Sequence, residues 1–400
     1  MMKIVVVGYG MAAARFASQM RNADVSMTIL GEERHPAYNR SLLADVLGGH
    51  YRPEAITLPA PGPGVDVCLG VPVISIDRAN QTVHMANGDE HHYDKLVIAT
   101  GSRPILPPFR GLYDHEGRPK SGVFAFRTLD DYTNLAAAVK NTKRAVVIGG
   151  GVLGIAAAQA LASCDVLVEI VHAGRHPMDR YLNGEAGGVL KTTLARLGID
   201  VYAKNRVKAI LGDQTVAGVK LDTGFVLDCD MVVLACGVAP RVELAKQAGL
   251  QIGRNKGIVI GDDLASVTDD RIHAIGECAE HAGRSFGLVA PAWEQADVLA
   301  ERLSGRDPTA LYHGSSFVMR LTTGEVDVAV VGDSLTTTDT GVIRVLNEAA
   351  GSYKMVAVRD NRVVAGIFVG DLDTIGTVTL AHTRQELLDA DKLHLVTTSQ

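Results

Sequence analysis

The first strand and turn of this chain read Lys3-Ile4-Val5-Val6-Val7-Gly8-Tyr9-Gly10-Met11-Ala12-Ala13. The β-branched apolar run predicts a strand buried on both faces, and a helix is expected to continue from the turn to Arg21. In the pattern G-x-G-x-x-A, Gly8 permits the tight turn, Gly10 lets the backbone approach a pyrophosphate, and Ala13 keeps the helix close to the strand. We expect a phosphate at the helix N-terminus, where free N–H groups and the helix dipole favour negative charge. The candidate cofactor-binding residues of this loop are Gly8, Gly10, Met11, Ala12 and Ala13.

A second strand, from Val25 to Leu30, ends in Gly31-Glu32-Glu33. Glu32 and Glu33 stand where an acidic side chain is expected to meet a ribose hydroxyl. A single glycine fingerprint is weak evidence, because it also fits an ordinary strand, turn and helix. The strand before it, the helix after it and the acids beyond together favour dinucleotide binding.

The composition is that of a globular protein with more than one core. The chain has 400 residues, of which 47% are hydrophobic and 21% are charged, and this length predicts two or three domains. The formal net charge of −6 gives no electrostatic reason to expect nucleic acid or an anionic membrane as a partner. No apolar run approaches the roughly 20 residues of a membrane-spanning helix, and no signal-peptide pattern precedes the first strand. The expected location is the cytoplasm.

The cysteines are spaced too irregularly to predict a shared role. None is paired as C-x-x-C or C-x-x-x-x-C, so the sequence predicts neither a redox dithiol nor a zinc or iron–sulfur site. Most are expected to be reduced, small apolar residues of the core. For Cys236 and Cys278, which lie beside glycines in suspected cofactor loops, a functional role is the less favoured alternative. The five cysteines are Cys68, Cys164, Cys229, Cys236 and Cys278.

Two further segments in the first part of the chain fit a dinucleotide site. Arg40 precedes a predicted helix from Ser41 to Leu47, and it is either a solvated charge or, as a nearby phosphate favours, an anion contact. A buried strand that begins near Tyr93 leads into Ala99-Thr100-Gly101-Ser102-Arg103-Pro104, where the proline prevents a helix. This turn fits either a simple strand end or a backbone that passes close beneath a flavin dinucleotide. We favour the second interpretation, with Ala99, Thr100 and Gly101 as candidate residues.

A second unit of strand, loop and helix begins at Lys143. The strand Arg144–Ile148 is followed by Gly149-Gly150-Gly151-Val152-Leu153-Gly154, a full G-x-G-x-x-G, and by an Ala-rich helix from Ile155 to Ser163. One such unit can arise by chance, whereas two of them argue for two nucleotides in one protein. The candidate residues of this loop are Gly149, Gly151, Val152, Leu153 and Gly154.

The second unit has no acid at the end of its second strand, Val166–Val171. His172 stands there and is followed by Ala173-Gly174-Arg175. An acid selects the free 2′-hydroxyl of NAD, whereas Arg and His tolerate the 2′-phosphate of NADP. Gly154 weakly favours NAD, and a surface position suits His172 nearly as well. Nicotinamide choice therefore stays open, with His172 and Arg175 slightly favouring NADPH.

Both nucleotide units are expected to end in the same kind of turn. The buried run Met231–Ala235 leads into Cys236-Gly237-Val238-Ala239-Pro240, which resembles the turn from Ala99 to Pro104. The chain then returns to the first domain, where a strand from Ile272 ends in Gly276-Glu277. Glu277 is placed to accept a ribityl hydroxyl of a flavin, although such an acid on its own is more often a charged turn residue. The candidate residues of these turns are Cys236 and Gly237 for NAD(P), and Gly276 and Glu277 for FAD.

The C-terminal part predicts a helix and then a small separate domain. The helix is expected to start at Pro291 or just beyond it, with Trp293 either on the flavin or in the core. Short strands then alternate with Gly turns over 312–370, and a helical pattern runs from Thr374 to Leu388. The predicted fold is α/β, with two Rossmann-like dinucleotide-binding domains and a small α+β C-terminal domain. The predicted divisions are 1–115 and 241–310 for the two parts of the FAD-binding domain, 116–240 for the NAD(P)-binding domain and 311–400 for the C-terminal domain.

Five of these motifs together resemble the two-dinucleotide flavoprotein reductases of the pyridine nucleotide–disulfide oxidoreductase superfamily. They are Gly8–Ala13, Tyr38-Asn39-Arg40, Ala99–Pro104, Gly149–Gly154 and Gly276-Glu277. The segments Tyr38–Leu43 and Phe286–Ala296 are most similar to the flavoprotein part of assimilatory nitrite reductase large subunits, and rubredoxin and ferredoxin reductases are slightly more distant. The resemblance implies FAD and NAD(P)H as cofactors. It also implies a C-terminal domain that shields the flavin or meets a partner, although a structural or dimer-forming role fits its residues equally well.

The chain departs from this family at several points. Disulfide reductases of the superfamily carry a C-x-x-x-x-C pair that is absent here. Many ferredoxin reductases place a Lys near the flavin where this chain has Asp45, and Ala156 replaces the Glu of the common pattern G-x-G-x-x-G-x-E. The replacement at Ala156 bears on the nicotinamide pocket and on the efficiency of hydride transfer. The chain ends at Gln400, before the iron–sulfur and siroheme regions of nitrite reductases, so we do not expect it to reduce nitrite by itself.

The resulting hypothesis is an NAD(P)H-dependent, FAD-containing electron-transfer reductase. Electrons would pass from nicotinamide through flavin to a ferredoxin- or rubredoxin-like protein or to a nitrate- or nitrite-reductase-type subunit. No side chain is predicted to act as a catalytic acid or base, and no metal site is predicted. A flavin oxidoreductase that acts directly on a small molecule or oxygen is one alternative, and a non-catalytic nucleotide-binding redox sensor or complex subunit is another. The expected assembly is a monomer or a homodimer.

Overall fold

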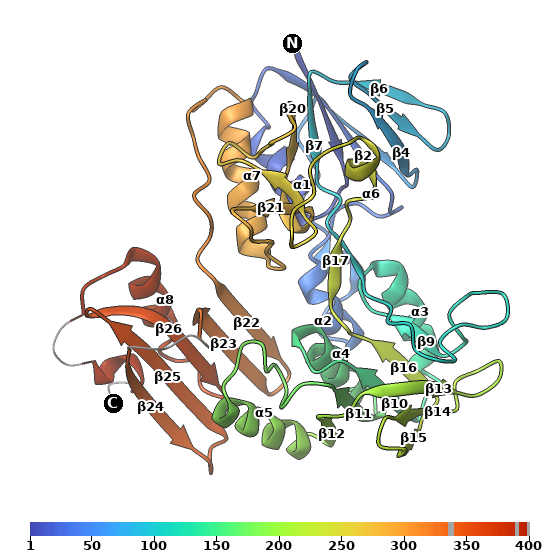
Figure 1. The fold of residues 1–400 in the computed structure, drawn as a ribbon, viewed down its shortest axis with the longest axis vertical. Coiled ribbons are helices and arrows are strands. Elements are labelled where there is room, and N and C mark those ends of the chain that lie inside the picture. Colours follow the sequence, from blue (N-terminus) through green and yellow to red (C-terminus); the bar gives the residue numbers. More distant parts are fainter. Residues whose placement is uncertain (335–339, 389–391, 398–400) are drawn as a thin grey trace. The chain divides into compact units, whose positions relative to one another are not determined.

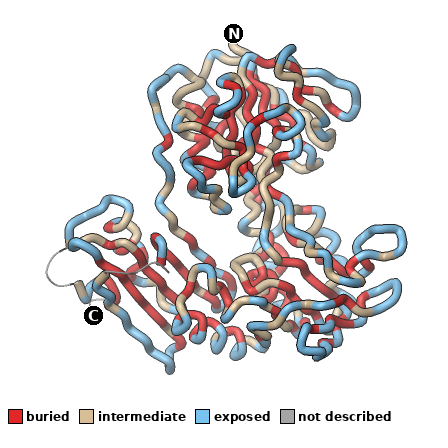
Figure 2. Tube along the Cα trace, in the orientation of Figure 1, coloured by how far each residue is buried: buried red, intermediate tan, exposed pale blue. Residues whose placement is uncertain are grey.

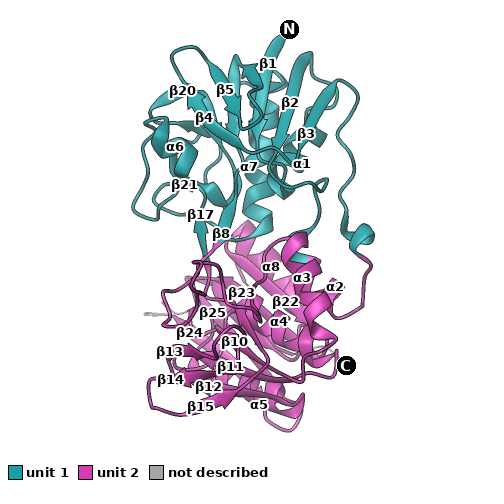
Figure 3. Cartoon of the chain, turned by 90° about the vertical axis from the view of Figure 1, so that its right-hand side faces the viewer, with its two compact units in different colours: residues 1–41, 53–103, 238–315 teal, residues 42–52, 104–237, 316–400 magenta. Residues whose placement is uncertain are grey.

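The computed structural model describes residues 1–334, 340–388 and 392–397. The chain divides into two compact units, each made of segments that are far apart in the sequence (Figure 3). Unit 1 comprises residues 1–41, 53–103 and 238–315, and unit 2 comprises residues 42–52, 104–237 and 316–400. Each unit contains one of the two glycine loops, and each is described by itself.

Unit 1 is built on an eight-stranded sheet in which the first strand of the chain lies between two parallel neighbours. Strand β1 (Met2–Val7) pairs in parallel with β2 (Val25–Gly31) on one side and with β7 (Lys95–Ile98) on the other. Strand β20 (Asp269–Ala274) extends the sheet beyond β7, so this late segment pairs with the strands from the start of the chain. The sheet order is β21-β18-β19-β20-β7-β1-β2-β3. The last four residues of β1 are buried, which confirms a strand covered on both faces.

Two long helices of unit 1, α1 (Met11–Gln19) and α7 (Val289–Leu303), pack against each other (Figure 1). The core of the unit joins the central strands to these helices through residues such as Phe16, Ile29 and Leu299. The shorter elements are β3 (Val65–Leu69), β4 (Val73–Asp77), β5 (Thr82–Met85), β6 (Glu90–His92), β8 (Ser102–Pro104), β17 (Val238–Pro240), β18 (Ile258–Ile260), β19 (Ala265–Ser266), β21 (Ala279–His281), α6 (Glu243–Gln247) and the 3-10 helices η1 (Arg40–Leu42), η2 (Pro53–Ile56) and η3 (Gly276–Cys278).

A buried carboxylate ties the β4–β5 hairpin to strand β20. Asp269 accepts hydrogen bonds from Arg78 Nε at 3.0 Å and from Arg271 Nε at 3.0 Å, and its side chain is 4% exposed. Burial acts to raise the pKa of Asp269, but the hydrogen bonds from Arg271 and Arg78 outweigh it and lower the pKa to about 2. The carboxylate is therefore charged in the folded protein over the whole physiological range.

We expect Asp269→Asn to lower the free energy of unfolding by about 2 kcal/mol at neutral pH. A group whose folded pKa lies below its unfolded value stabilises the protein above the unfolded pKa, and this stabilisation is lost as the pH falls toward the folded pKa. The difference between wild type and variant should thus shrink as the pH falls from about 4 toward 2. Urea unfolding across this range measures it, and a difference that does not change with pH would contradict the assignment.

Unit 2 contains a second parallel sheet with the order β12-β11-β10-β16-β9. Its strands are β9 (Val123–Ala125), β10 (Arg144–Ile148), β11 (Leu167–His172), β12 (Ile199–Ala203) and β16 (Met231–Leu234). The helices around it are α2 (Leu43–Leu47), α3 (Leu129–Val139), α4 (Val152–Ala162) and α5 (Gly184–Arg196), and a small antiparallel sheet is formed by β13 (Val207–Leu211), β14 (Gly218–Leu221) and β15 (Val226–Asp228). Strand β10, like β1, lies between two parallel neighbours and is buried after its first residue, so the predicted repeat is confirmed.

The C-terminal strands of unit 2 form an antiparallel sheet with the order β22-β23-β26-β25-β24. They are β22 (Val318–Thr323), β23 (Val326–Gly332), β24 (Gly341–Asn347), β25 (Ser352–Arg359) and β26 (Arg362–Val369), followed by α8 (Ile375–Arg384) and the 3-10 helix η4 (Leu393–Leu395). Figure 2 shows that the middle strands are buried, whereas β24 at the edge is mostly exposed. The prediction of a small α+β domain is consistent with these elements.

Within unit 2, this C-terminal sheet packs on helix α5, which follows the second glycine loop in the sequence. Strands β23, β25 and β26 contact α5, and β22 contacts α4. The hydroxyl of Tyr353 accepts a hydrogen bond from Asn183 Nδ2 at 2.7 Å and donates one to Glu185 Oε2 at 3.2 Å. Arg344 forms an ion pair with the same glutamate at 2.9 Å. The contacts within unit 2 thus anchor the small domain to the helix layer of the second nucleotide unit.

Several element boundaries differ from the sequence predictions by a few residues. Helix α1 ends at Gln19 and not at Arg21, because the chain turns where Ala23 N–H bonds to Met20 O at 2.9 Å. Helix α7 begins at Val289, two residues before the predicted Pro291. A proline is tolerated there, since the N–H groups of the first helical turn have no intrahelical partner. Among the described residues, no helix is both long and apolar enough to cross a membrane.

Candidate nucleotide-binding sites

The first glycine loop of unit 1 requires glycine at Gly8 and leaves open space at Gly10. Gly8 has φ +104°, and a Cβ atom there would lie 2.3 Å from the Ala99 carbonyl oxygen. Gly10 is the N-cap of α1, has extended backbone angles, and has nothing within 4 Å of the position that a Cβ would take. No side chain caps the helix, and its first turn contains no acidic residue. The free N–H groups at the N-terminus of α1 therefore suit the pyrophosphate of a dinucleotide, and the roles of Met11, Ala12 and Ala13 stay predictions.

Two turns of unit 1 that were predicted to contact a flavin lie together. Glu277 Oε2 accepts a hydrogen bond from Ser102 Oγ at 2.7 Å, which joins the Gly276-Glu277 turn to the turn that begins at Ala99. Gly276 has φ +78°, and a Cβ there would lie 3.2 Å from Ala12 Cβ. The structure thus brings together the glycine loop, the segment from Ala99 to Gly101, and the acidic turn at Glu277.

The two acids after β2 are held by different arginines. Glu33 accepts hydrogen bonds from the Tyr38 hydroxyl at 2.7 Å and from Arg40 Nη2 at 2.5 Å. The guanidinium of Arg40 also lies 5.0 Å from the centre of the Tyr38 ring. Burial acts to lower the pKa of Arg40, and the charges of Tyr38 and Glu33 outweigh it and raise the pKa. Arg40 is therefore a fixed cation, and the alternative of a solvated charge at a helix start is wrong.

Glu32 forms an ion pair with Arg241, a residue that the sequence analysis did not identify. Arg241 follows Pro240, at the end of the turn that resembles Ala99–Pro104. Its backbone is bound to that first turn, since Arg241 N–H donates to Gly101 O at 2.9 Å and Thr100 Oγ1 donates to Arg241 O at 2.7 Å. Its position after the repeated turn was the one signal that pointed to it.

Trp293 lies on helix α7 but is not a core residue. It is 37% exposed, and the guanidinium of Arg15 lies 6.0 Å from its ring centre. Arg15 is itself fixed by two hydrogen bonds to Asp297, of 2.7 and 2.9 Å. The core alternative for Trp293 is therefore wrong, whereas its contact with a flavin stays a prediction. Pro291 is buried in the first turn of the same helix.

The second glycine loop, in unit 2, repeats the geometry of the first. Gly149 has φ +121°, and a Cβ there would lie 2.2 Å from the Ala235 carbonyl oxygen, just as Gly8 faces Ala99. Gly149 N–H bonds to Val171 O at 2.8 Å, as Gly8 N–H bonds to Leu30 O at 2.8 Å. A Cβ at Gly154 would lie 1.8 Å from the Gly149 carbonyl oxygen, so this glycine is required for close packing of helix and loop.

The anion-facing end of this loop is also open. Gly151 is the N-cap of α4, with no capping side chain and nothing within 4 Å of the position that a Cβ would take. Val152 and Leu153 therefore offer their N–H groups as Met11 and Ala12 do. Cys236 Sγ, in the turn that ends at Gly237, donates to Ile148 O at 3.4 Å, and burial raises the pKa of this thiol to about 11. Cys236 is therefore a protonated thiol that packs beside the loop.

His172 is bound to the second glycine loop by one ring nitrogen and to Asp179 by the other. Gly150 N–H donates to His172 Nδ1 at 3.2 Å, and His172 Nε2 lies 3.2 Å from Asp179 Oδ1. Asp179 Oδ2 also accepts the Arg175 N–H at 3.0 Å. Burial acts to raise the pKa of Asp179, but the hydrogen bonds from Arg175 and His172 outweigh it and lower the pKa. The sequence analysis missed this carboxylate, because it stands in a loop beyond the strand end where an acid is expected.

The two departures from the family pattern lie in the helices of unit 2. Ala156 is 8% exposed in α4, a helix that is buried on most of its surface. Asp45 lies in α2, where burial raises the pKa of its carboxyl and His50 Nδ1 stands 3.8 Å away. All five cysteines are unpaired thiols. Among the residues that the structure describes, no group of three His, Cys, Asp or Glu side chains is arranged to hold a metal ion.

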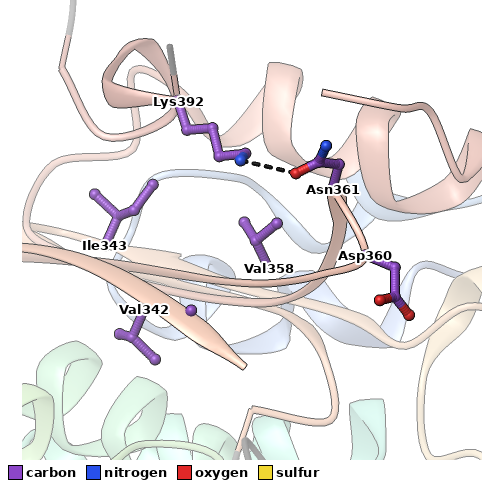
Figure 4. A pocket seen from close by; sticks show the side chains of 7 residues that line it. Val342, Ile343, Val358, Asp360, Asn361 and Lys392 are labelled. Atoms are coloured by element: carbon purple, nitrogen blue, oxygen red, sulfur yellow. Dashed lines mark hydrogen bonds between the residues drawn. The ribbon is translucent and has the colours of Figure 1, made fainter. Parts of the chain in front are cut away.

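A hollow lies in the C-terminal sheet (Figure 4). It is bordered by the edge strand β24 and by the turn between β25 and β26, where Lys392 Nζ donates to Asn361 Oδ1 at 2.9 Å. None of the residues predicted to bind either nucleotide lines it. We therefore assign no nucleotide to this hollow.

Comparison with known proteins gives relatives over nearly the whole chain. Nitrite reductase [NAD(P)H] of Bacillus subtilis is 35% identical over 92% of this chain and 46% of its own length. The assimilatory nitrate reductase electron transfer subunit of the same organism is 34% identical over 92% of this chain and 48% of its own length. The chain thus spans about half the length of these relatives.

The fold is also similar to solved structures. The covalent putidaredoxin reductase–putidaredoxin complex matches with a TM-score of 0.87 and 23% identity, covering 99% of this chain and 96% of the matched chain. The model of the family described as pyridine nucleotide-disulphide oxidoreductase matches residues 2–296, which include both glycine loops and the Gly276-Glu277 turn. With these loops, turns and sheets, the chain belongs to the pyridine nucleotide-disulphide oxidoreductase family.

Proposed function

We propose that this chain is an NAD(P)H-dependent, FAD-containing electron-transfer reductase that serves a redox protein or a separate reductase subunit. The repeated loop geometry carries the proposal, because Gly8 and Gly149 face the carbonyls of Ala99 and Ala235 in the same way. Family membership supports FAD and NAD(P)H as the two nucleotides. The name of the relative that is an electron transfer subunit supports an acceptor outside this chain.

Unit 1 would hold FAD, and unit 2 would hold NAD(P)H. The helix N-terminus after Gly10 would bind the FAD pyrophosphate, with Arg40 as a nearby cation. Glu32 would accept from the adenosine ribose and Glu277 from the ribityl chain. When bound, the flavin accepts a hydride and releases electrons one at a time. The remaining residues in this assignment are Gly8, Met11, Ala12, Ala13, Glu33, Ala99, Thr100, Gly101, Gly276, Pro291 and Trp293 for FAD, and Gly149, Gly151, Val152, Leu153, Gly154, His172, Arg175, Cys236 and Gly237 for NAD(P).

Electrons would leave from the flavin and not through a pair of thiols. Cys278 is fully buried and donates to Ile98 O and Ile275 O at 3.3 Å, and burial raises its pKa. Cys236 is held as a thiol with a pKa of about 11. A thiol must lose its proton to act as a nucleophile, so neither cysteine suits a relay. Unpaired thiols also fit the reducing cytoplasm that we propose as the location.

The experiment that tests this function compares acceptors in steady-state turnover. FAD-loaded protein is supplied with NAD(P)H and then with a rubredoxin, a ferredoxin or oxygen alone. We expect a redox protein to be reduced much faster than oxygen. Hydrogen peroxide formed as fast as any protein acceptor is reduced would instead indicate an oxidase, and the absence of turnover even with artificial acceptors would indicate a nucleotide sensor. Sedimentation of the same sample would distinguish the proposed monomer from the proposed homodimer.

Nicotinamide preference is proposed to depend on two opposed charges next to the second glycine loop. Arg175 is exposed and would attract the 2′-phosphate of NADPH, whereas Asp179 would repel it. His172 contributes less than its sequence position implies, because both its ring nitrogens are already bound. We propose that Arg175 prevails and leaves a slight preference for NADPH.

Arg175→Ala is expected to lower kcat/KM for NADPH by roughly tenfold to a hundredfold and to spare NADH. The loss corresponds to one charge-assisted hydrogen bond of about 1.5–3 kcal/mol. Asp179→Asn keeps the shape of the side chain and should raise the NADPH/NADH ratio. The measurement is kcat/KM for both nucleotides on wild type and both variants. A ratio that neither substitution moves would mean that these side chains do not face the ribose.

A further inference from the structure

We propose that Gln295 and Tyr312 form a buried pair that positions the Gly276-Glu277 turn and thereby sets the affinity and the reduction potential of the bound flavin. The proposal rests on the assignment of FAD to unit 1. Neither residue is expected to touch the flavin, so both are positioning residues.

The direct contact is made by Gln295, in the middle of helix α7. Its Oε1 accepts the backbone N–H of Gly276 at 2.7 Å, and the residue is 2% exposed. Burying an amide side chain in a helix core is unfavourable unless its polar atoms are hydrogen-bonded, so an apolar residue would fill this space more easily. The contact with Gly276 supplies a reason for an amide at this position.

Tyr312 interacts with the other end of the amide. Burial raises the pKa of Tyr312, and side-chain hydrogen bonds with Ser315 and Gln295 act to lower it. The Tyr312 hydroxyl lies 2.7 Å from Ser315 Oγ, which in turn donates to Glu294. The tyrosine is 2% exposed, and its backbone N–H donates to Asp262 O at 2.8 Å. Because Tyr312 is fixed at both its backbone and its hydroxyl, the amide of Gln295 has one favoured orientation, with Oε1 toward Gly276.

The ring of Tyr312 is fixed as well. His281 meets it edge-on, with 4.9 Å between the ring centres, and His281 Nε2 lies 2.7 Å from Asp262 Oδ1. The chain of contacts from Asp262 to Gly276 thus runs through residues of one compact unit. Movement of Gln295 or His281 would break the hydrogen bond to Gly276 or to Asp262.

The turn that receives this contact has little freedom of its own. Gly276 has φ +78° and lies against Ala12 in the first turn of α1. The next residue is Glu277, whose Oε2 accepts from Ser102 Oγ at 2.7 Å. A shift of Gly276 would therefore move both the proposed ribityl acceptor and the backbone next to the pyrophosphate loop. Small displacements of groups around a flavin change its binding and its electronic environment.

The test uses the full chain, four single variants and one double variant. Gln295→Leu removes both hydrogen bonds, Gln295→Glu keeps the acceptor toward Gly276, and Tyr312→Phe removes only the hydroxyl. The control is Gln159→Leu, the same substitution on helix α4 of unit 2, where Gln159 Oε1 is buried without a hydrogen-bond partner among the described residues. For each variant we would measure the FAD dissociation constant of the apoprotein, the visible spectrum of the bound flavin, its midpoint potential and the melting temperature.

We expect Gln295→Leu to weaken FAD binding roughly tenfold and to shift the flavin spectrum and potential. Tyr312→Phe should have a smaller effect of the same sign, and Gln295→Glu should recover part of the loss. The variant with both Gln295→Leu and Tyr312→Phe should be no worse than Gln295→Leu alone, since both changes act through one contact. Gln159→Leu should leave FAD affinity, spectrum and potential unchanged.

A folded Gln295→Leu variant with wild-type FAD affinity, spectrum and potential would overturn the proposal and leave Gln295 as a structural residue. If Gln295→Leu does not fold, Tyr312→Phe takes its place, because it removes a single oxygen atom, and an unchanged flavin in that variant overturns the proposal equally. Wild-type protein that binds no FAD would instead refute the assignment of unit 1, so the two failures are distinguishable.

Discussion

Gly10→Asp is expected to abolish FAD binding without unfolding the protein. The side chain fits, because nothing lies within 4 Å of its Cβ position and the backbone of Gly10 is extended. Asp is also a favoured N-cap residue, so helix α1 should keep its stability. Its carboxylate would stand where the pyrophosphate is proposed to bind. Two like charges about 4 Å apart repel each other by about 4 kcal/mol at an effective dielectric constant of about 20, which is a loss of roughly a thousandfold in affinity.

Gly10→Asn is the matched control for this prediction. It has nearly the same size and also caps the helix, but it carries no charge. FAD affinity, measured by titration of the apoprotein, should fall in the order wild type, Asn, Asp. Equal affinities for all three proteins would mean that no phosphate lies at the N-terminus of α1.

Gly151→Asp is expected to leave FAD bound and to abolish its reduction by NAD(P)H. Gly151 is the N-cap of α4 and has open space at its Cβ position, like Gly10. The same repulsion acts, but on the other nucleotide, and should lower kcat/KM for NAD(P)H roughly a thousandfold. Chemical reduction of the flavin by dithionite should be unaffected. Rapid mixing with NAD(P)H, compared with Gly151→Asn, measures the effect.

The paired design separates the two sites. If Gly151→Asp released FAD and Gly10→Asp spared it, the assignment of the nucleotides to the two units would be reversed. If both variants lost both nucleotides, the loops would not be independent. Only a loss of FAD in one variant and of NAD(P)H reactivity in the other agrees with the proposed roles.

Both loops could be predicted from the sequence because their geometry is local. A strand, a glycine with positive φ and a helix follow each other within a few residues, so the pattern around Gly8 and Gly149 is visible without any knowledge of the fold. The strand-end turns at Ala99 and Cys236 were also predicted from their own patterns, whereas the approach of the Ala99 and Ala235 carbonyls to Gly8 and Gly149 depends on the fold. The boundaries of helices were less predictable, as the start of α7 before Pro291 illustrates.

The residues that the sequence did not reveal act across long separations or from loops without a pattern. Arg241 and Glu32 are 209 residues apart, and only the return of the chain to unit 1 brings them together. Asp179 contacts His172 from an irregular segment, and His172 stands at the position where an acid is expected. Gln295 lies in the segment Phe286–Ala296, which resembles the family, but its contact with Gly276 depends on how α7 packs.

The most direct test of the central claim follows the bound flavin through one anaerobic cycle. FAD-loaded protein is mixed with one equivalent of NAD(P)H, and an oxidised redox protein of the ferredoxin or rubredoxin type is then added. We predict that NAD(P)H bleaches the flavin absorbance and that the acceptor restores it, with acceptor reduced in proportion to the electrons supplied. A flavin that neither NADH nor NADPH bleaches, in protein that has bound FAD, would contradict the account.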